Sequence, residues 1–160
     1  MCIRDSTGAI ANYPNNDRGY WHADWPYNQT NAAHIPAPYA DTCSKLSSLW
    51  MLTEFNEETG GTLLLPGSHR VKTNPSGGDL FDREVPHPSE LQICAPAGSV
   101  MLFDSRLWHR HTSANEVMSA GVDNVGQRLW LDIQYVPWWL DVSSMIPGLA
   151  DYETRAEGLG

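Results

Sequence analysis

The sequence predicts a single β-rich domain, and two observations support this class. Its 160 residues include 13 glycines and 11 prolines, spread along the chain rather than clustered. They divide it into many short segments, which favours strands and turns over long helices. With 41% hydrophobic and 18% charged residues, the composition is that of a folded domain able to bury a core.

Six runs of β-branched, aromatic or alternating residues are the strand candidates. In order they are residues 19–25, 49–55, 62–65, 92–94, 99–104 and 128–136. Proline and glycine at 58–61, 66–67 and 96–98 predict tight turns, so neighbouring strands are expected to pair antiparallel. Residues 71–90 and 115–127 are expected to form long surface loops, and the tail 143–160 gives no clear signal.

Charge and hydropathy narrow the classes of partner. A net charge of −9 gives no basic surface for nucleic acid or an anionic membrane, so a small-molecule partner is favoured. No apolar run approaches the roughly 18 residues of a membrane span, and no signal peptide is recognisable. We expect a soluble cytoplasmic protein, and the sequence gives no indication of its oligomeric state.

The first six residues are treated separately. Back-translated, Met1 to Ser6 resemble a transposon-end adapter used in DNA library preparation, so we interpret residues 1–6 as a sequencing artefact. On that interpretation the natural protein extends upstream of Thr7. Residues 7–160 are then one domain that lacks its N-terminal part.

Three residues form a candidate metal site. His22 and Asp24 are two apart on a predicted strand, so both side chains leave the same face of the sheet. Such a pair is weak evidence alone, but His109 follows the apolar strand 99–104 and offers a third ligand. Two histidines and a carboxylate on one face are the facial triad that holds iron(II) with open positions. His111 is the rival to His109, which we prefer because it directly follows the strand.

Arg128 opens the last predicted strand. A guanidinium entering an apolar strand is costly unless it meets an anion. Arg128 is therefore either paired with a surface carboxylate or positioned to bind a carboxylate of 2-oxoglutarate.

These residues carry a family resemblance. Residues 57–70, which include Pro66-Gly67-Ser68-His69, resemble the PGSH signature of the phytanoyl-CoA dioxygenase family, with His22-x-Asp24 upstream and His109, Asn115 and Arg128 downstream. The resemblance covers roughly residues 19–140. The asparagine and arginine follow the distal histidine at longer intervals than is usual in the family. The fold it implies is a double-stranded β-helix, or cupin-like jelly roll, here incomplete at the N-terminus.

The resemblance also implies a function: an Fe(II)- and 2-oxoglutarate-dependent dioxygenase that uses O2 to hydroxylate a small organic substrate, with 2-oxoglutarate decarboxylated to succinate and CO2. By position, His22, Asp24 and His109 would bind iron and Arg128 would bind 2-oxoglutarate. Thr112 or Ser113 could supply a hydroxyl to 2-oxoglutarate, and Trp25 and Tyr27 could line the substrate pocket. The alternatives are a non-catalytic metal- or ligand-binding jelly roll and an inactive fragment of such an enzyme. The sequence does not identify the substrate.

Overall fold

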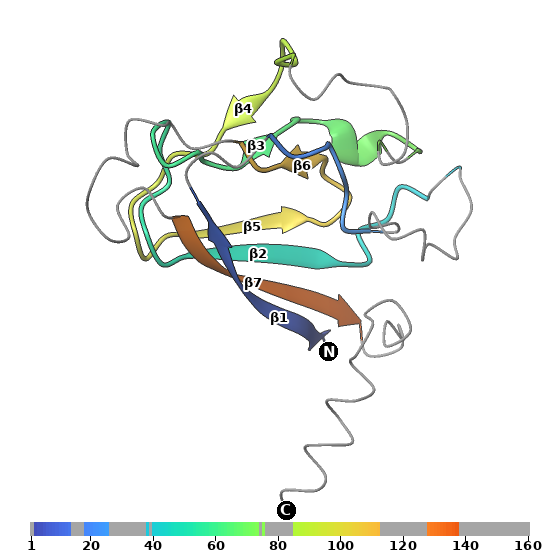
Figure 1. Ribbon diagram of the computed structural model, residues 1–160. Helices are drawn as coiled ribbons and strands as arrows, with labels where there is room; N and C mark the ends of the chain where they lie inside the picture. Colours follow the sequence, from blue (N-terminus) through green and yellow to red (C-terminus); the bar gives the residue numbers. More distant parts are fainter. Residues whose placement is uncertain are drawn as a thin grey trace, which may run out of the picture.

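The computed structural model describes residues 2–13, 18–25, 38, 40–73, 75, 85–112 and 128–137, with only the backbone for 2–6. Within these residues, strands form two sheets that lie one above the other (Figure 1). The larger sheet has the order β1-β7-β2-β5, and the smaller has the order β4-β3-β6. The strands are β1 (Cys2–Asn12), β2 (Leu46–Met51), β3 (Leu63–Leu64), β4 (Leu91–Gln92), β5 (Val100–Asp104), β6 (His109–Arg110) and β7 (Arg128–Pro137).

Every strand pair is antiparallel, and most paired strands are distant in sequence. β7 lies between β1 and β2, while β3 lies between β4 and β6. This arrangement of two facing sheets is the double-stranded β-helix, so the predicted all-β class and jelly-roll fold are confirmed. No helix among the described residues is long and apolar enough to cross a membrane.

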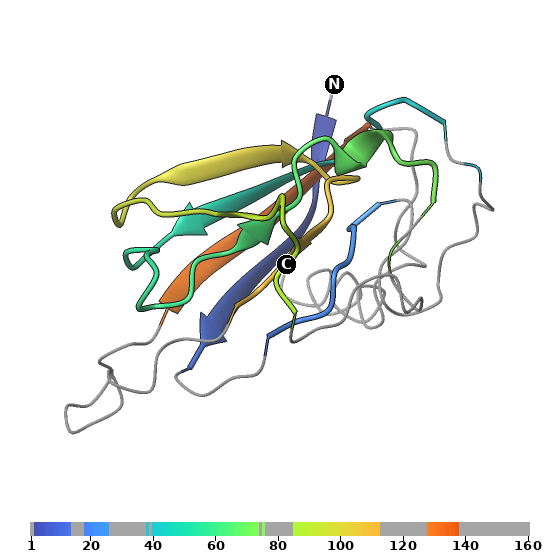
Figure 2. The same ribbon diagram turned by 90° about the horizontal axis from the view of Figure 1, so that it is seen from above.

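The predicted strands are found with shifted bounds, except the first. Residues 19–25 do not form a regular strand and are drawn as a blue line without an arrow in Figure 2. Instead, His22 forms an isolated bridge with His109 of β6, the edge strand of the small sheet. β1 and the two-residue strand β6 were not predicted. β1 begins inside the six residues that we interpreted as an artefact, and their origin stays a prediction.

The predicted turns contain the glycines that the backbone requires. Gly60, Gly67 and Gly98 have φ values of 77°, 85° and 87°, a region that costs glycine little and other residues more. Gly67 also precedes the 3₁₀-helix η1 (Ser68–Arg70), so the PGSH run forms a tight turn into one helical turn. The expected loop 71–90 is only partly within the described residues, and 115–127 and 143–160 lie outside them.

Two groups of buried side chains form the core. One consists of residues from β2, β5, β7 and the turn after β2: Leu49, Met51, Phe55, Phe103 and Trp130. The other combines residues 21 and 23 with residues in or next to β3 and β6: Trp21, Ala23, Leu63, Leu65 and Trp108. Because side chains alternate along extended backbone, burying Trp21 and Ala23 on one face directs His22 and Asp24 to the other.

Candidate metal centre

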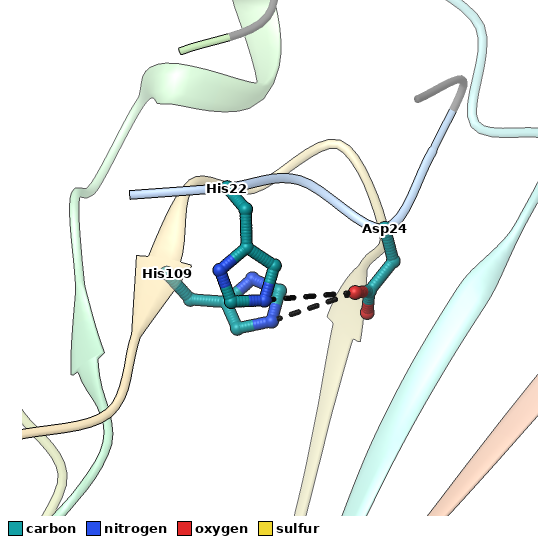
Figure 3. A group of neighbouring side chains, drawn as sticks. All are labelled: His22, Asp24 and His109. Atoms are coloured by element: carbon teal, nitrogen blue, oxygen red, sulfur yellow. Dashed lines mark ion pairs between the residues drawn. The ribbon is translucent and has the colours of Figure 1, made fainter. Parts of the chain in front are cut away.

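His22, Asp24 and His109 converge, as Figure 3 shows. One ligand atom from each lies within 4.8 Å of the other two. The Nε2 atoms of His22 and His109 are 4.0 and 3.7 Å from Asp24 Oδ1, and the ring centroids are 4.3 Å apart. These separations leave room for one ion bonded to all three, since ligand bonds to divalent iron or zinc are about 2.0–2.2 Å long.

The backbone sets the spacing of the two histidines. The His22 N–H donates to the His109 carbonyl (3.0 Å), and the His109 N–H donates to the His22 carbonyl (2.9 Å). His109 is also paired with Leu64 of β3. Next to it, the Trp108 N–H donates to the buried hydroxyl of Ser68 (2.8 Å), so the serine of PGSH anchors the residue before the metal-site histidine.

Each imidazole has its other nitrogen at a backbone carbonyl. His22 Nδ1 lies 3.1 Å from the Tyr20 oxygen, and His109 Nδ1 lies 2.9 Å from the Leu107 oxygen. A carbonyl only accepts hydrogen bonds, which assigns the proton of a neutral ring to Nδ1 and leaves the Nε2 lone pair available. Burial, with a contribution from His109, lowers the pKa of His22 to about 4, so this ring is neutral at pH 7.

A buried serine holds the carboxylate and contacts a second serine. The Ser47 hydroxyl donates to Asp24 Oδ2 (2.7 Å) and is itself 2.7 Å from the Ser105 hydroxyl. Ser47 and Ser105 are fully buried. Burial raises the pKa of Asp24, but the two imidazoles and the Ser47 hydrogen bond outweigh it and bring the pKa below its usual value. Asp24 is therefore an anion with Oδ1 directed at the histidines.

A cavity of about 300 Å³ adjoins this group. It is lined by the three residues together with side chains of the large sheet and the β6 region: Ile10, Ala11, Asn12, Leu49, Thr62, Arg110, His111, Arg128, Trp130 and Asp132. The three candidate ligands thus border an open space. Two imidazoles, one carboxylate and an accessible side fit an iron(II) site of the facial-triad type.

Arg128 lies in the wall of the same cavity. It is fully buried, and none of its guanidinium nitrogens has a hydrogen-bond partner among the described residues. The guanidinium carbon is 4.6 Å from both the Phe55 and the Trp130 ring centroids. Burial lowers the pKa of Arg128 to about 10, which still leaves a positive charge at pH 7. A buried cation without an anion is costly, so the site fits a carboxylate from a ligand.

The other predicted site residues are placed differently. His111 is exposed and lines the cavity but is outside the three-residue group. Trp25 and Thr112 are buried and are not among the cavity-lining residues. Trp25 is two residues after the buried Ala23, so side-chain alternation could have predicted its burial. Tyr27 and Ser113 lie outside the described residues.

Sequence reasoning missed the supporting polar residues. Ser47 donates to Asp24 and contacts Ser105, and Ser68 accepts a hydrogen bond from the backbone N–H of Trp108, beside His109. A serine in an otherwise apolar strand, as in residues 46–51, was the available signal for Ser47. Asp132 was also missed, although a carboxylate inside the predicted strand 128–136 is as unexpected as the arginine that opens it.

The comparisons with known proteins agree with this fold. The ectoine dioxygenase of Bordetella parapertussis is 32% identical over 114 residues, covering 59% of this chain and 35% of that protein. Iron-bound HygX from Streptomyces hygroscopicus aligns with a TM-score of 0.61 and 17% identity over 87% of this chain and 60% of HygX. HygX with nickel and 2-oxoglutarate bound has a TM-score of 0.59, with 15% identity over 87% of this chain and 59% of HygX.

The chain spans about a third of the length of the curated relatives it matches. The profile of the family described as "Phytanoyl-CoA dioxygenase (PhyH)" matches residues 4–116, which include His22, Asp24, His109 and the PGSH turn. The chain therefore belongs to the phytanoyl-CoA dioxygenase (PhyH) family.

Proposed function

We propose that this chain carries the active site of an Fe(II)- and 2-oxoglutarate-dependent dioxygenase that hydroxylates a small organic substrate. His22, Asp24 and His109 would hold the iron, and Arg128 would hold 2-oxoglutarate. The observation that carries the proposal is the convergence of the two Nε2 atoms and Asp24 Oδ1 at the edge of a cavity.

The polar contacts around these atoms favour metal binding over a purely structural cluster. A structural His-Asp pair would direct an N–H at the carboxylate. Here both Nδ1 atoms instead face backbone carbonyls, and the second carboxylate oxygen is occupied by Ser47. Three lone-pair donors facing one another repel unless a cation lies between them.

Arg128 supports 2-oxoglutarate as the co-substrate. Its uncompensated positive charge borders the same cavity, so a dicarboxylate could reach the guanidinium with one end and the metal site with the other. Phe55 and Trp130 beside the guanidinium exclude water and strengthen that ion pair. The relatives named as dioxygenases, and HygX with nickel and 2-oxoglutarate bound, support the same assignment.

The division of roles follows from the residues. When bound, iron(II) supplies the activation of O2 that oxidative decarboxylation of 2-oxoglutarate and C–H hydroxylation require. The chain contributes the ligand geometry, the clamp on the distal carboxylate and a partly apolar cavity. A hydroxyl from Thr112 or Ser113 to 2-oxoglutarate, and Trp25 and Tyr27 as substrate contacts, stay predictions.

The test is an anaerobic titration of the protein with iron(II) and then 2-oxoglutarate, followed by the visible charge-transfer absorption of the chelate. We expect His22→Ala and His109→Ala to abolish the absorption, whereas His111→Ala retains it. Arg128→Met should weaken the affinity for 2-oxoglutarate without removing iron binding. The proposal fails if the parent protein shows no absorption, and the ligand assignment fails if His111→Ala, rather than His109→Ala, removes it.

A further inference from the structure

Asp132 is a carboxylate in the cavity that the proposed chemistry leaves unused. It is on β7, four residues after Arg128 and two after Trp130, and all three line the cavity. Its backbone is paired with Leu49 on one side and Gly8 on the other. A Cβ built on Gly8 would meet nothing within 4 Å, so the strand beside Asp132 leaves open space.

The Asp132 carboxylate is poorly hydrogen-bonded and forms no ion pair within the described residues, although Lys45 and His109 are near enough to favour its anion. Its Oδ1 is buried and has no hydrogen-bond partner among the described residues. Its Oδ2 accepts one long hydrogen bond from Gln134 Nε2 (3.3 Å). Burial, with a contribution from the nearby Asp24, raises the pKa of Asp132 to about 6, so it is still mainly an anion at pH 7.

The cavity's other charged groups have different partners or roles. Arg110 is paired with Glu90 (2.7 Å) and lies over the Trp21 ring. Arg128 forms no ion pair with Asp132 in the described structure and is assigned to the co-substrate. With both iron and 2-oxoglutarate in place, Asp132 would remain an unpaired anion, which is a costly arrangement unless a ligand supplies the cation.

We propose that Asp132 recognises a protonated amine or amidine on the substrate. This inference rests on the proposed function and adds the substrate class. The basic nitrogen would donate to Asp132 Oδ1, while the rest of the substrate extends toward His22, Asp24 and His109, which line the same cavity. Substrates with a carboxylate in that place would be rejected, because Asp24 and Asp132 both border the cavity.

The test compares three aromatic probes of similar size: benzylammonium, benzyl alcohol and benzoate. Each is titrated into the protein loaded with nickel(II) and 2-oxoglutarate, and binding is followed by ligand-observed NMR. A charge-assisted hydrogen bond should make benzylammonium bind at least about tenfold more tightly than benzyl alcohol, with benzoate weakest. Asp132→Asn should remove the preference for the cation.

Asp41→Asn is the matched control, because it removes the same charge from a side chain that is 62% exposed. It should keep the preference. Any of three results would overturn the inference: equal binding of benzylammonium and benzyl alcohol, no binding of benzylammonium to the parent complex, or a preference for benzylammonium that survives in Asp132→Asn. The visible absorption of the iron(II)–2-oxoglutarate chelate separates the two proposals. If the parent protein lacks this absorption, the dioxygenase site is refuted. If only Asp132→Asn lacks it, Asp132 takes part in co-substrate binding instead.

Discussion

Ser47→Ala tests whether the buried serine that is hydrogen-bonded to Asp24 supports metal binding. In the parent protein its hydroxyl donates to Asp24 Oδ2 at 2.7 Å and contacts the Ser105 hydroxyl at the same distance. Alanine removes the donor without adding volume. The backbone hydrogen bonds of residues 19–25 still hold Asp24 in place, but its carboxylate loses the contact that fixes its rotation.

The size of the effect follows from the kind of bond that is lost. A hydrogen bond to an ionised acceptor contributes about 1.5–3 kcal/mol, which corresponds to roughly a 10- to 150-fold change in an equilibrium constant. Partners that orient metal ligands typically affect metal affinity by about 10- to 100-fold when they are removed. We therefore expect Ser47→Ala to bind iron(II) at least tenfold more weakly.

The assay is anaerobic calorimetric titration with iron(II), with Ser48→Ala as the matched control. Ser48 is the adjacent buried serine, but its hydroxyl donates to the Ile133 carbonyl (2.9 Å), away from Asp24. Both variants should lose some stability, and only Ser47→Ala should lose iron affinity. An unchanged affinity in Ser47→Ala, or an equal loss in Ser48→Ala, would refute the reasoning.

Three further predictions concern stability. Burial raises the pKa of Asp132 from 3.8 to about 6. Its ionisation therefore destabilises the folded state increasingly between about pH 4 and pH 6, and fully above pH 6. Asp132→Asn should raise Tm at about pH 7.5 and change it little at about pH 3.5. Arg128→Met should raise Tm of the protein without ligands, because it removes a buried charge. We expect 2-oxoglutarate to raise Tm of the iron-loaded parent in thermal melts, and this rise should be smaller in Arg128→Met because the co-substrate binds more weakly. A Cβ on Gly61 would lie 2.1 Å from the backbone oxygen of Ile93, whereas one on Gly19 would lie 2.5 Å from the exposed His111 ring, which can move away. In urea unfolding, Gly61→Ala should lower the free energy of unfolding by about 1–3 kcal/mol, and Gly19→Ala should lower it clearly less.

The sequence was sufficient to predict the residues that the structure brings together. A two-residue spacing in extended backbone gives His22 and Asp24 a common face, and His109 ends an apolar run. The serines that orient this group could not be placed, because their partners are distant in sequence: Ser47 meets Asp24 and Ser105, and Ser68 meets Trp108. Such contacts depend on the register between strands, which a single sequence does not specify.

The same limit explains the errors in the fold. Residues 19–25 alternate as a strand should, but only His22 forms a bridge, since alternation reports which faces are buried and not how many backbone pairs form. β6 was missed because two residues carry no periodicity. β7 was predicted well from its long alternating run, yet its place between β1 and β2 depends on pairings across most of the chain.

The bridge between His22 and His109 makes a bound metal a cross-link. Residues 19–25 are joined to 105–111 by a short series of backbone hydrogen bonds, from Gly19, His22, Asp24 and Trp25 on one side and from His109 on the other. An ion bonded to His22, Asp24 and His109 would connect these two segments, because its ligands come from both. Separating the segments would then require release of the metal. Bound metal should therefore slow hydrogen–deuterium exchange at the amides of His22, Asp24 and His109 more than at the amides of β2 or β5.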